Sequence, residues 1–213
     1  MNALIIVDMQ NDFVEGGTLA VPGGKDLVPL INRLQPRFDF VIATQDWHPA
    51  THASFAANHP GRKAFEVIDL EGLPHTLWPT HCVQETPGAD FVPGLERNRW
   101  AKIVQKGTAP EIDSYSGFFD NGKRRSTELA TFLEAHKIDD LYVVGVATDY
   151  CVKFTVLDAT GLGLKVHLIE DACRGVNLQP GDVDRAIDDM RKAGAWIAHS
   201  DAVFPPSLFT REK

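Results

Sequence analysis

Cysteine is scarce in this chain of 213 residues: it has only Cys82, Cys151 and Cys173, and no Cys-x-x-Cys pair. An odd number of cysteines at irregular spacing argues against a disulfide framework and weakens the case for a redox protein. We therefore expect reduced thiols and a cytoplasmic location. The pattern alone assigns no role to Cys82 or Cys173.

Basic residues are too few to favour an anionic partner. Lys and Arg number 21 against 29 Asp and Glu, which gives a net charge of −8. That balance argues against nucleic acid or an anionic membrane surface as the main partner. No apolar run approaches the roughly 20 residues of a membrane span. The N-terminal "MNALIIVDMQND" also lacks the basic start of a signal peptide.

The sequence has no internal repeat, no low-complexity tract and no GxSxG motif, so a serine hydrolase is disfavoured. Its hydrophobic fraction of 44% and charged fraction of 23% are those of an ordinary globular protein. A chain of this length buries roughly 70% of its unfolded surface, which is enough for a stable core without disulfides or structural metals. We expect one domain over residues 1–213.

Six apolar runs alternate with helical patterns along the chain. The runs are rich in Val and Ile and nearly continuous in hydrophobicity, as strands covered on both faces should be. They occupy residues 3–8, 40–46, 101–106, 141–147, 165–171 and 195–200. Helical spacing of apolar residues is found at 27–34, 129–133, 149–162 and between Pro180 and Gly194. This alternation predicts an α/β fold with one doubly wound, mainly parallel sheet and helices on both faces.

The segment 47–100 interrupts this alternation. It is rich in Pro, Gly, His and Trp and shows little periodicity. Loops of that length inside a compact domain are usually functional. We predict no contacts for residues 58–75.

Four chemically capable residues follow the predicted strands. Asp8 and Asp46 close the first two, Lys106 closes the third, and Cys151 lies in the turn after the fourth. In an open α/β sheet, ligands bind beyond the carboxyl ends of the strands. We therefore expect these four side chains to meet at one edge of the sheet.

Cys151 lies in the first turn of a predicted helix, where unpaired N–H groups and the helix dipole favour a thiolate. Asp8 could take its proton, and Lys106 could stabilise the resulting anion. These three residues make an acyl-transfer site plausible. The alternatives are a buried apolar cysteine and a structural Asp–Lys pair.

The stretch "TQDWHPATHASF" offers metal ligands. Asp46 and His48 point the same way if the chain leaves the strand in extended form, and His81 could supply a third ligand. Such a set suits zinc, iron or manganese. The alternative is a group of ordinary loop histidines. His52 and Ser54 are better placed as supporting partners than as ligands.

Three aromatic residues, Phe13, Trp78 and Tyr115, lie just past strand ends or in the long loop. They could sandwich a flat heteroaromatic ring, although core packing is the commoner role of such residues. If they do, the polar residues above would face an aromatic pocket.

Six stretches together carry a family resemblance: "LIIVDMQNDFVEGGTLAVPGG", "IATQDWHPATHASFA", "LWPTHCVQETPGADF", "QKGTAPEIDSYSGFFDNG", "VVGVATDYCVKFTVLDA" and "EDACRGVN". They run in order from residue 4 to about 177. The chain thus resembles the nicotinamidases of the isochorismatase-like cysteine hydrolase superfamily, whose fold is a three-layer α/β arrangement. The residues matching its pattern are Asp8, Lys106 and Cys151 as a catalytic triad, Asp46, His48 and His81 as metal ligands, and Ala147 with Cys151 as an oxyanion hole.

The resemblance implies hydrolysis of nicotinamide to nicotinate and ammonia through a cysteine thioester, in NAD salvage. It also implies a cis bond between Val146 and Ala147, one divalent cation that grips the pyridine nitrogen, and a ring held among the three aromatics. Zinc is the first expectation for that cation, with iron and manganese as alternatives. Pyrazinamide as a second substrate and a homo-oligomeric state stay open.

Three alternatives remain. A sister enzyme of the same fold could act on another small amide, such as an N-carbamoyl compound, but those relatives generally lack the Asp-x-His and the second His. A redox protein would pair Cys151 with another cysteine. A metallohydrolase would attack with a metal-bound water and would keep its activity without Cys151.

Overall fold

A computed structural model describes residues 1–70 and 72–203 of the chain. Six of its strands form one sheet in the order β5-β2-β1-β6-β7-β8, and every neighbouring pair is parallel. The strands of this sheet are β1 Asn2–Val7, β2 Phe40–Asp46, β5 Trp100–Lys106, β6 Asp140–Val146, β7 Lys165–Arg174 and β8 Trp196–Ala198. The predicted doubly wound parallel sheet is confirmed.

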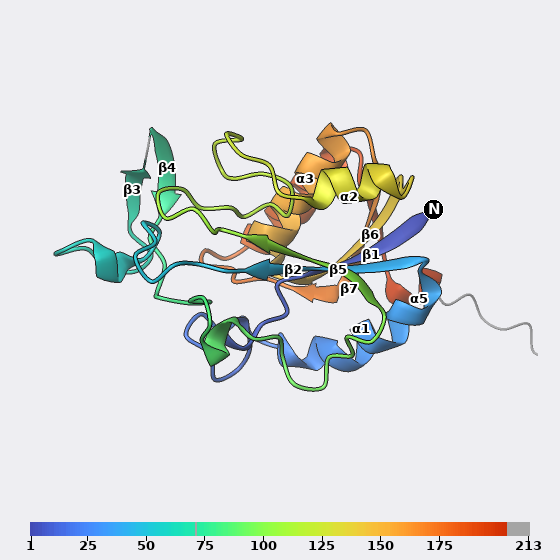
Figure 1. The fold of residues 1–213 in the computed structure, drawn as a ribbon, viewed down its shortest axis with the longest axis horizontal. Helices are drawn as coiled ribbons and strands as arrows, with labels where there is room; N and C mark the ends of the chain where they lie inside the picture. Colours follow the sequence, from blue (N-terminus) through green and yellow to red (C-terminus); the bar gives the residue numbers. More distant parts are fainter. Residues whose placement is uncertain (71, 204–213) are drawn as a thin grey trace, which may run out of the picture.

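Helices cover both faces of the sheet (Figure 1). One face packs against α1, and the other packs against α2, α3 and α4. The short α5 lies on the same side as α1. The helices are α1 Val28–Leu34, α2 Leu129–Ala135, α3 Lys153–Gly161, α4 Asp182–Lys192 and α5 Ser200–Val203. None of the helices in the described residues is long and apolar enough to cross a membrane.

The central strand β1 explains why the two layers form. In the run Ala3–Val7 every side chain is fully buried, and alternate residues enter opposite cores. Leu4 and Ile6 join the core under α1, whereas Ile5 and Val7 join the core under α2, α3 and α4. Since strand side chains alternate between faces, only a strand covered on both sides can bury such a run.

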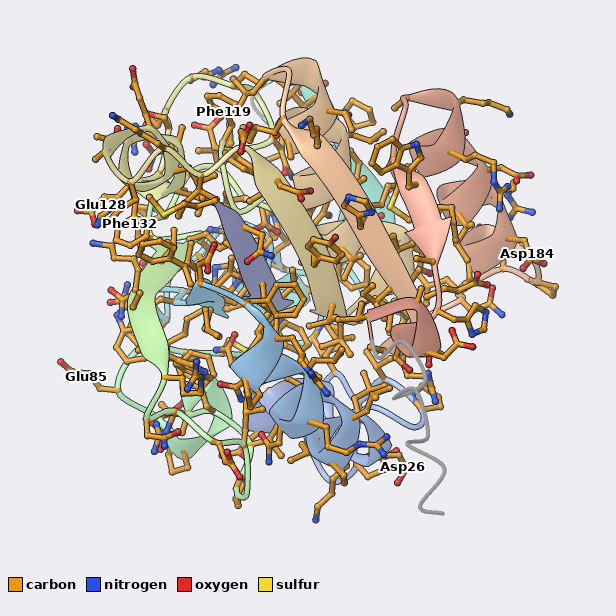
Figure 2. The ribbon with its side chains drawn as sticks, turned by 90° about the vertical axis from the view of Figure 1, so that its right-hand side faces the viewer. Asp26, Glu85, Phe119, Glu128, Phe132 and Asp184 are labelled. Carbon is orange, nitrogen blue, oxygen red and sulfur yellow. The ribbon has the colours of Figure 1, made fainter. Side chains whose placement is uncertain are left out.

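Helix α4 shows the local signals that begin and end a helix. Asp182 and Asp184 lie in its first turn, and Arg191 and Lys192 lie in its last. Acidic residues at the N-terminus and basic residues at the C-terminus complement the helix dipole. Figure 2, which views the molecule from the side, shows Asp184 on the outer surface. Asp26 and Glu128 also lie on the outer surface in this view.

The edge strands differ from the prediction of strands covered on both faces. In β5, Ala101, Ile103 and Gln105 are exposed on one face of the sheet. The last predicted strand, 195–200, is shorter than expected: β8 ends at Ala198, and Ser200 begins α5.

The long segment between β2 and β5 contains a small antiparallel hairpin, β3 Val67–Leu70 and β4 Leu73–Thr76, which the sequence pattern did not predict. In Figure 1 this hairpin stands beyond the carboxyl end of β2, apart from the sheet. Short 3-10 turns make up much of the other regular structure in the loops: Asn11–Phe13, Lys25–Leu27, Gln35–Arg37, Ala56–Asn58 and Pro87–Ala89.

Candidate active site

The carboxyl edge of the sheet brings Asp8, Lys106 and Cys151 together. Asp8 follows β1, Lys106 ends β5, and Cys151 lies just after β6. Lys106 Nζ is 2.9 Å from Asp8 Oδ2 and 3.4 Å from Cys151 Sγ. The predicted meeting of these side chains is therefore present, and all three are buried.

Lys106 is held from several sides. Its ammonium donates hydrogen bonds to Asp46 and to the carbonyl of Ser114, the latter at 2.9 Å. The Lys106 side chain is buried, with 2% of the residue exposed. Burial alone would lower the pKa of Lys106, but Asp46 and Asp8 raise it well above its ordinary value. The side chain therefore stays a cation beside the thiol.

Asp8 and Cys151 are the two groups of the cluster that could exchange a proton. Burial raises the pKa of Asp8, with Lys106 opposing, so this carboxylate is a stronger base than an exposed one. Burial also raises the pKa of the Cys151 thiol well above its ordinary value, again with Lys106 opposing. Thr44 fixes the base, because its hydroxyl donates to Asp8 Oδ1 over 2.6 Å. The ion pair of Asp8 Oδ2 with Lys106 Nζ, at 2.9 Å, favours the carboxylate form of Asp8 beside the thiol.

Cys151 owes its position to an unusual helix start. The peptide bond between Val146 and Ala147 is cis, where the family resemblance implied it. A π-helical turn, Thr148–Val152, follows and continues into α3. The predicted helix therefore begins close to the expected residue, but its first turn is wider than an α-helical turn.

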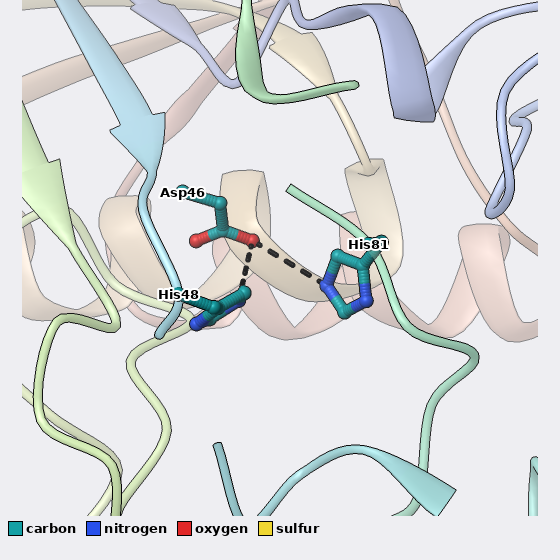
Figure 3. A group of neighbouring side chains, drawn as sticks. All are labelled: Asp46, His48 and His81. Atoms are coloured by element: carbon teal, nitrogen blue, oxygen red, sulfur yellow. Dashed lines mark ion pairs between the residues drawn. The ribbon is translucent and has the colours of Figure 1, made fainter. Parts of the chain in front are cut away.

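Asp46, His48 and His81 form a second cluster beside the first (Figure 3). Asp46 Oδ2 is 3.4 Å from His48 Nε2 and 3.8 Å from His81 Nε2. The other carboxylate oxygen, Oδ1, accepts the hydrogen bond from Lys106. Asp46 therefore joins the two clusters, and its predicted neighbours are those that the structure brings to it.

The ring nitrogens show which histidines can bind a metal. His48 Nδ1 is 2.8 Å from the Gly107 carbonyl, and His81 Nδ1 is 2.7 Å from the Pro79 carbonyl. Each Nδ1–H donates to its carbonyl, which leaves the Nε2 lone pair toward Asp46. His48 Nε2 is buried without a hydrogen-bond partner. One carboxylate oxygen and two such nitrogens fit a divalent cation.

His52 differs from these two histidines. Its Nδ1 accepts the backbone N–H of Ser54 at 3.1 Å, so its proton lies on Nε2. Burial lowers the pKa of His52 to about 4, which keeps the ring neutral. A protonated Nε2 has no lone pair for a metal. The His52 ring lies against the His48 ring, with centroids 4.4 Å apart, so a supporting role for His52 and Ser54 stays a prediction that this contact favours.

Gly107 leaves the space that His48 needs. A Cβ on Gly107 would lie 2.3 Å from His48 Cε1, and the backbone has φ +63. We expect Gly107→Ala to displace His48 and to weaken binding of zinc at least tenfold, as loss of a ligand's support commonly does. Zinc competition with a chromogenic chelator measures this.

Gly163→Ala is the matched control. Gly163 has φ +82, and a Cβ there would meet no atom within 4 Å. Both changes carry a backbone cost of about 1 kcal/mol. Only the first should affect zinc binding, and equal weakening in both variants would contradict the assignment of His48 as a ligand.

Aromatic side chains enclose a cavity over the two clusters. Phe13, Trp78 and Tyr115 all line it, and Asp46, His81, Ala147 and Cys151 line it too. Trp78 Nε1 donates to Tyr115 Oη at 3.0 Å, which fixes the two rings. The three aromatics named from the sequence therefore face one pocket together.

Four residues of this pocket were missed: Leu19, Asp113, Tyr150 and Val176. Tyr150 packs edge-to-face on Trp78, with ring centroids 4.8 Å apart. Its position next to Cys151 was a usable signal, as was Asp113 near Tyr115 in "EIDSYSG". Nothing in the local pattern pointed to Leu19 or Val176, which come from separate loops.

Cys82 and Cys173 are buried and unpaired. Burial raises the pKa of Cys173 to about 12 and that of Cys82 well above its ordinary value. Their sulfurs face the backbone carbonyls of Gly88 and Val143, whereas Cys151 has Asp8 as a candidate base. This weakens the redox alternative, in which one of them would partner Cys151.

Comparison with known proteins gives a consistent result. The Isochorismatase domain family matches residues 2–202. A nicotinamidase of Escherichia coli (strain K12) is 54% identical over 92% of this chain and 93% of its own. A nicotinamidase/pyrazinamidase structure from Acinetobacter baumanii has a TM-score of 0.92 at 44% identity, covering 95% of this chain and 97% of that one. A Pyrococcus horikoshii pyrazinamidase in complex with zinc has a TM-score of 0.77 at 39% identity, covering 93% and 98%.

Proposed function

This chain belongs to the isochorismatase family, and on that premise we propose that it hydrolyses nicotinamide to nicotinate and ammonia in NAD salvage. The observation that carries the proposal is a single pocket that contains both a thiol and candidate metal ligands. Cys151 lines the same cavity as Asp46 and His81, two of the three proposed ligands, and aromatic rings enclose it. A flat carboxamide with a ring nitrogen suits such a pocket.

Acylation begins at the thiol. Asp8 accepts the proton of Cys151, and the sulfur attacks the carboxamide carbon. Lys106, 3.4 Å from the sulfur, stabilises the negative charge. The resulting oxyanion is assigned to the backbone N–H groups of Ala147 and Cys151, and each such donor is worth roughly 3 kcal/mol in comparable sites. Asp8 then returns its proton to the leaving nitrogen, and ammonia departs.

Deacylation restores the enzyme. Asp8, again a carboxylate, accepts a proton from a water molecule that attacks the thioester carbon. The C–S bond breaks, Cys151 recovers its proton from Asp8, and the nicotinic acid formed releases its carboxyl proton to solvent and leaves as nicotinate. Each proton that Asp8 takes is given back within the same half-reaction, so one base serves both steps.

Asp46, His48 and His81 would hold a divalent cation beside this pair. When bound, such a cation supplies a Lewis-acid site for the pyridine nitrogen of the substrate. Zinc is our first assignment, supported by zinc in the Pyrococcus horikoshii relative and by the donor set, with iron and manganese as alternatives. Phe13, Trp78 and Tyr115 would then keep the ring in plane.

We expect a chelator to act mainly on substrate binding. Removal of the cation should raise KM for nicotinamide at least about tenfold, while kcat falls less than KM rises. Alkylation of Cys151 by iodoacetamide should continue without the cation. Steady-state kinetics before and after restoring zinc measure this. Loss of kcat at an unchanged KM would instead favour the metallohydrolase alternative.

The activity itself is tested by measuring ammonia and nicotinate released from nicotinamide by the purified, zinc-loaded protein. Equal amounts of both products are expected, and pyrazinamide serves as a second substrate. Turnover of an N-carbamoyl compound without turnover of nicotinamide would replace this proposal with the sister-enzyme alternative.

Further expectations belong to this proposal. A cytoplasmic location is supported by three buried, unpaired thiols. We also propose that residues 1–213 act as one hydrolase domain, and that association into a homo-oligomer is compatible with the activity. Fractionation of cells and light scattering of the purified protein test location and assembly.

A further inference from the structure

One buried carboxylate at the site has no part in the mechanism above. Asp113 is 3% exposed and lies in the loop after β5. It lines the same cavity as Asp46, His81 and Cys151. Its Oδ1 accepts the backbone N–H of Ser114 at 2.7 Å. A carboxylate placed there at the cost of desolvation calls for a counter-charge nearby.

Imidazoles surround the carboxylate of Asp113. His75 Nε2 is 3.7 Å from Oδ2 and is buried without a hydrogen-bond partner. Ligand atoms of His48 and His52 lie within 4.8 Å of an Asp113 oxygen and of each other. His48 is one of the three proposed ligands, so Asp113 lies next to the proposed cation site.

Asp113 is not itself the centre of a second metal site. His52 would have to contribute Nε2, but that nitrogen carries the proton because Nδ1 accepts the Ser54 N–H. His48 cannot serve both sites, since its Nδ1 is bonded to Gly107 and its Nε2 faces Asp46. Asp113 can therefore act on the proposed cation through its negative charge, without binding a metal ion itself.

The charges of the buried side chains at this edge of the sheet show what the negative charge of Asp113 would balance. Asp8, Asp46 and Asp113 are carboxylates, and Lys106 is the ammonium among them; all four are at most 4% exposed. With neutral imidazoles and a protonated thiol, these groups carry two negative charges in total. A divalent cation at Asp46 brings the sum to zero. Without Asp113 the loaded site would carry an uncompensated positive charge, which is costly when buried.

We propose that Asp113 is a positioning residue that acts through charge: it is the uncoordinated anion that balances a divalent cation on Asp46, His48 and His81. The inference rests on the proposed function only in taking those three residues as ligands. The inference predicts that Asp113 affects the affinity of the protein for the cation, although Asp113 is not one of the proposed ligands. Partners that support metal ligands typically contribute 10–100-fold to affinity.

The test is zinc affinity of the full chain, measured by competition between the protein and a chromogenic chelator, with no substrate present. Asp113→Asn keeps an oxygen for the Ser114 N–H and removes only the charge. We expect it to weaken zinc binding about 10–100-fold. Asp113→Glu restores the charge and should bind zinc within about threefold of the parent. His81→Ala gives the level of binding without the site.

Asp120→Asn is the matched control from the same loop. Asp120 is also buried, but its carboxylate holds the backbone N–H groups of Gly122, Arg124 and Arg125 and lines a neighbouring cavity. Asp120→Asn should keep zinc affinity within about threefold of the parent value while lowering the melting temperature. If Asp113→Asn does not fold, Asp113→Ser, whose hydroxyl can accept the same N–H, takes its place.

Unchanged zinc affinity in Asp113→Asn would overturn the inference, as would equal weakening in Asp113→Asn and Asp120→Asn. Failure of Asp113→Glu to recover affinity would overturn it too. None of these results depends on turnover of nicotinamide, so this inference and the proposed activity can fail separately.

Discussion

Replacing Cys151 by serine is expected to lower kcat for nicotinamide hydrolysis at least about 10⁴-fold. The hydroxyl of serine is a much weaker acid than a thiol, so Asp8 can no longer generate the attacking anion. Ammonia release measured at saturating nicotinamide tests this. Zinc content and binding of nicotinamide should stay near the parent values, because the ligand cluster and the aromatic rings are untouched.

Cys173→Ser is the control for the loss of a buried thiol. Cys173 is 5% exposed and packs in the core with Cys151, yet it does not line the active-site cavity among the described residues. It should keep kcat within about twofold, although its melting temperature falls because a polar hydroxyl replaces a sulfur in the core. Full activity in Cys151→Ser would contradict the assignment of Cys151 as the nucleophile and favour direct attack by a metal-bound water.

Replacing Asp8 by asparagine is the second change with a large expected effect, a loss of about 10³- to 10⁴-fold in kcat/KM. The amide has the shape of the carboxylate and can still accept from Thr44, but it cannot take the thiol proton. Asp8→Glu should recover part of the rate. A variant with less than a tenfold loss would show that another group is the base.

The pH profile separates this role from a structural one. Because burial raises the pKa of Asp8, kcat/KM of the parent should fall as pH drops through that raised value, where the carboxyl becomes protonated. The base is present above this pKa and lost below it. The residual rate of Asp8→Asn should lack this acid limb, and its persistence would assign the limb to another group.

Much of the fold is legible in the sequence because parallel strands are hydrophobic on both faces. The run from Ala3 to Val7 can only be central, and β1 is central. The β3–β4 hairpin gave no such signal, since Val67 is largely exposed and its strand buries little surface. A strand that contributes little to the core leaves little trace in a hydrophobic pattern.

The site was predictable where the sheet rule applies and not elsewhere. Asp8, Asp46 and Lys106 follow strands, so their meeting follows from a parallel sheet. The burial of Lys106 depends on carboxylates from two other strands, and the cis bond before Ala147 came only from the family resemblance. Asp113 reaches the pocket through loop geometry, which no periodicity encodes.

The Val146–Ala147 bond and the π-helical turn make a further point about local patterns. "VVGVATDYC" predicts a strand, a turn and a helix, and each is present. Which N–H groups point into the cavity depends on the backbone angles between them. Composition does not specify those angles, so the oxyanion-hole assignment rested on resemblance to a family.

The proposed mechanism depends on a thioester at Cys151, which rapid-quench mass spectrometry can detect. Zinc-loaded protein is mixed with excess nicotinamide, quenched in acid during turnover and digested. We expect a nicotinoyl group on the peptide that contains Cys151, formed and lost at rates that match kcat, and none on Cys82 or Cys173. Steady release of ammonia with no acylated Cys151 at any time point would contradict it.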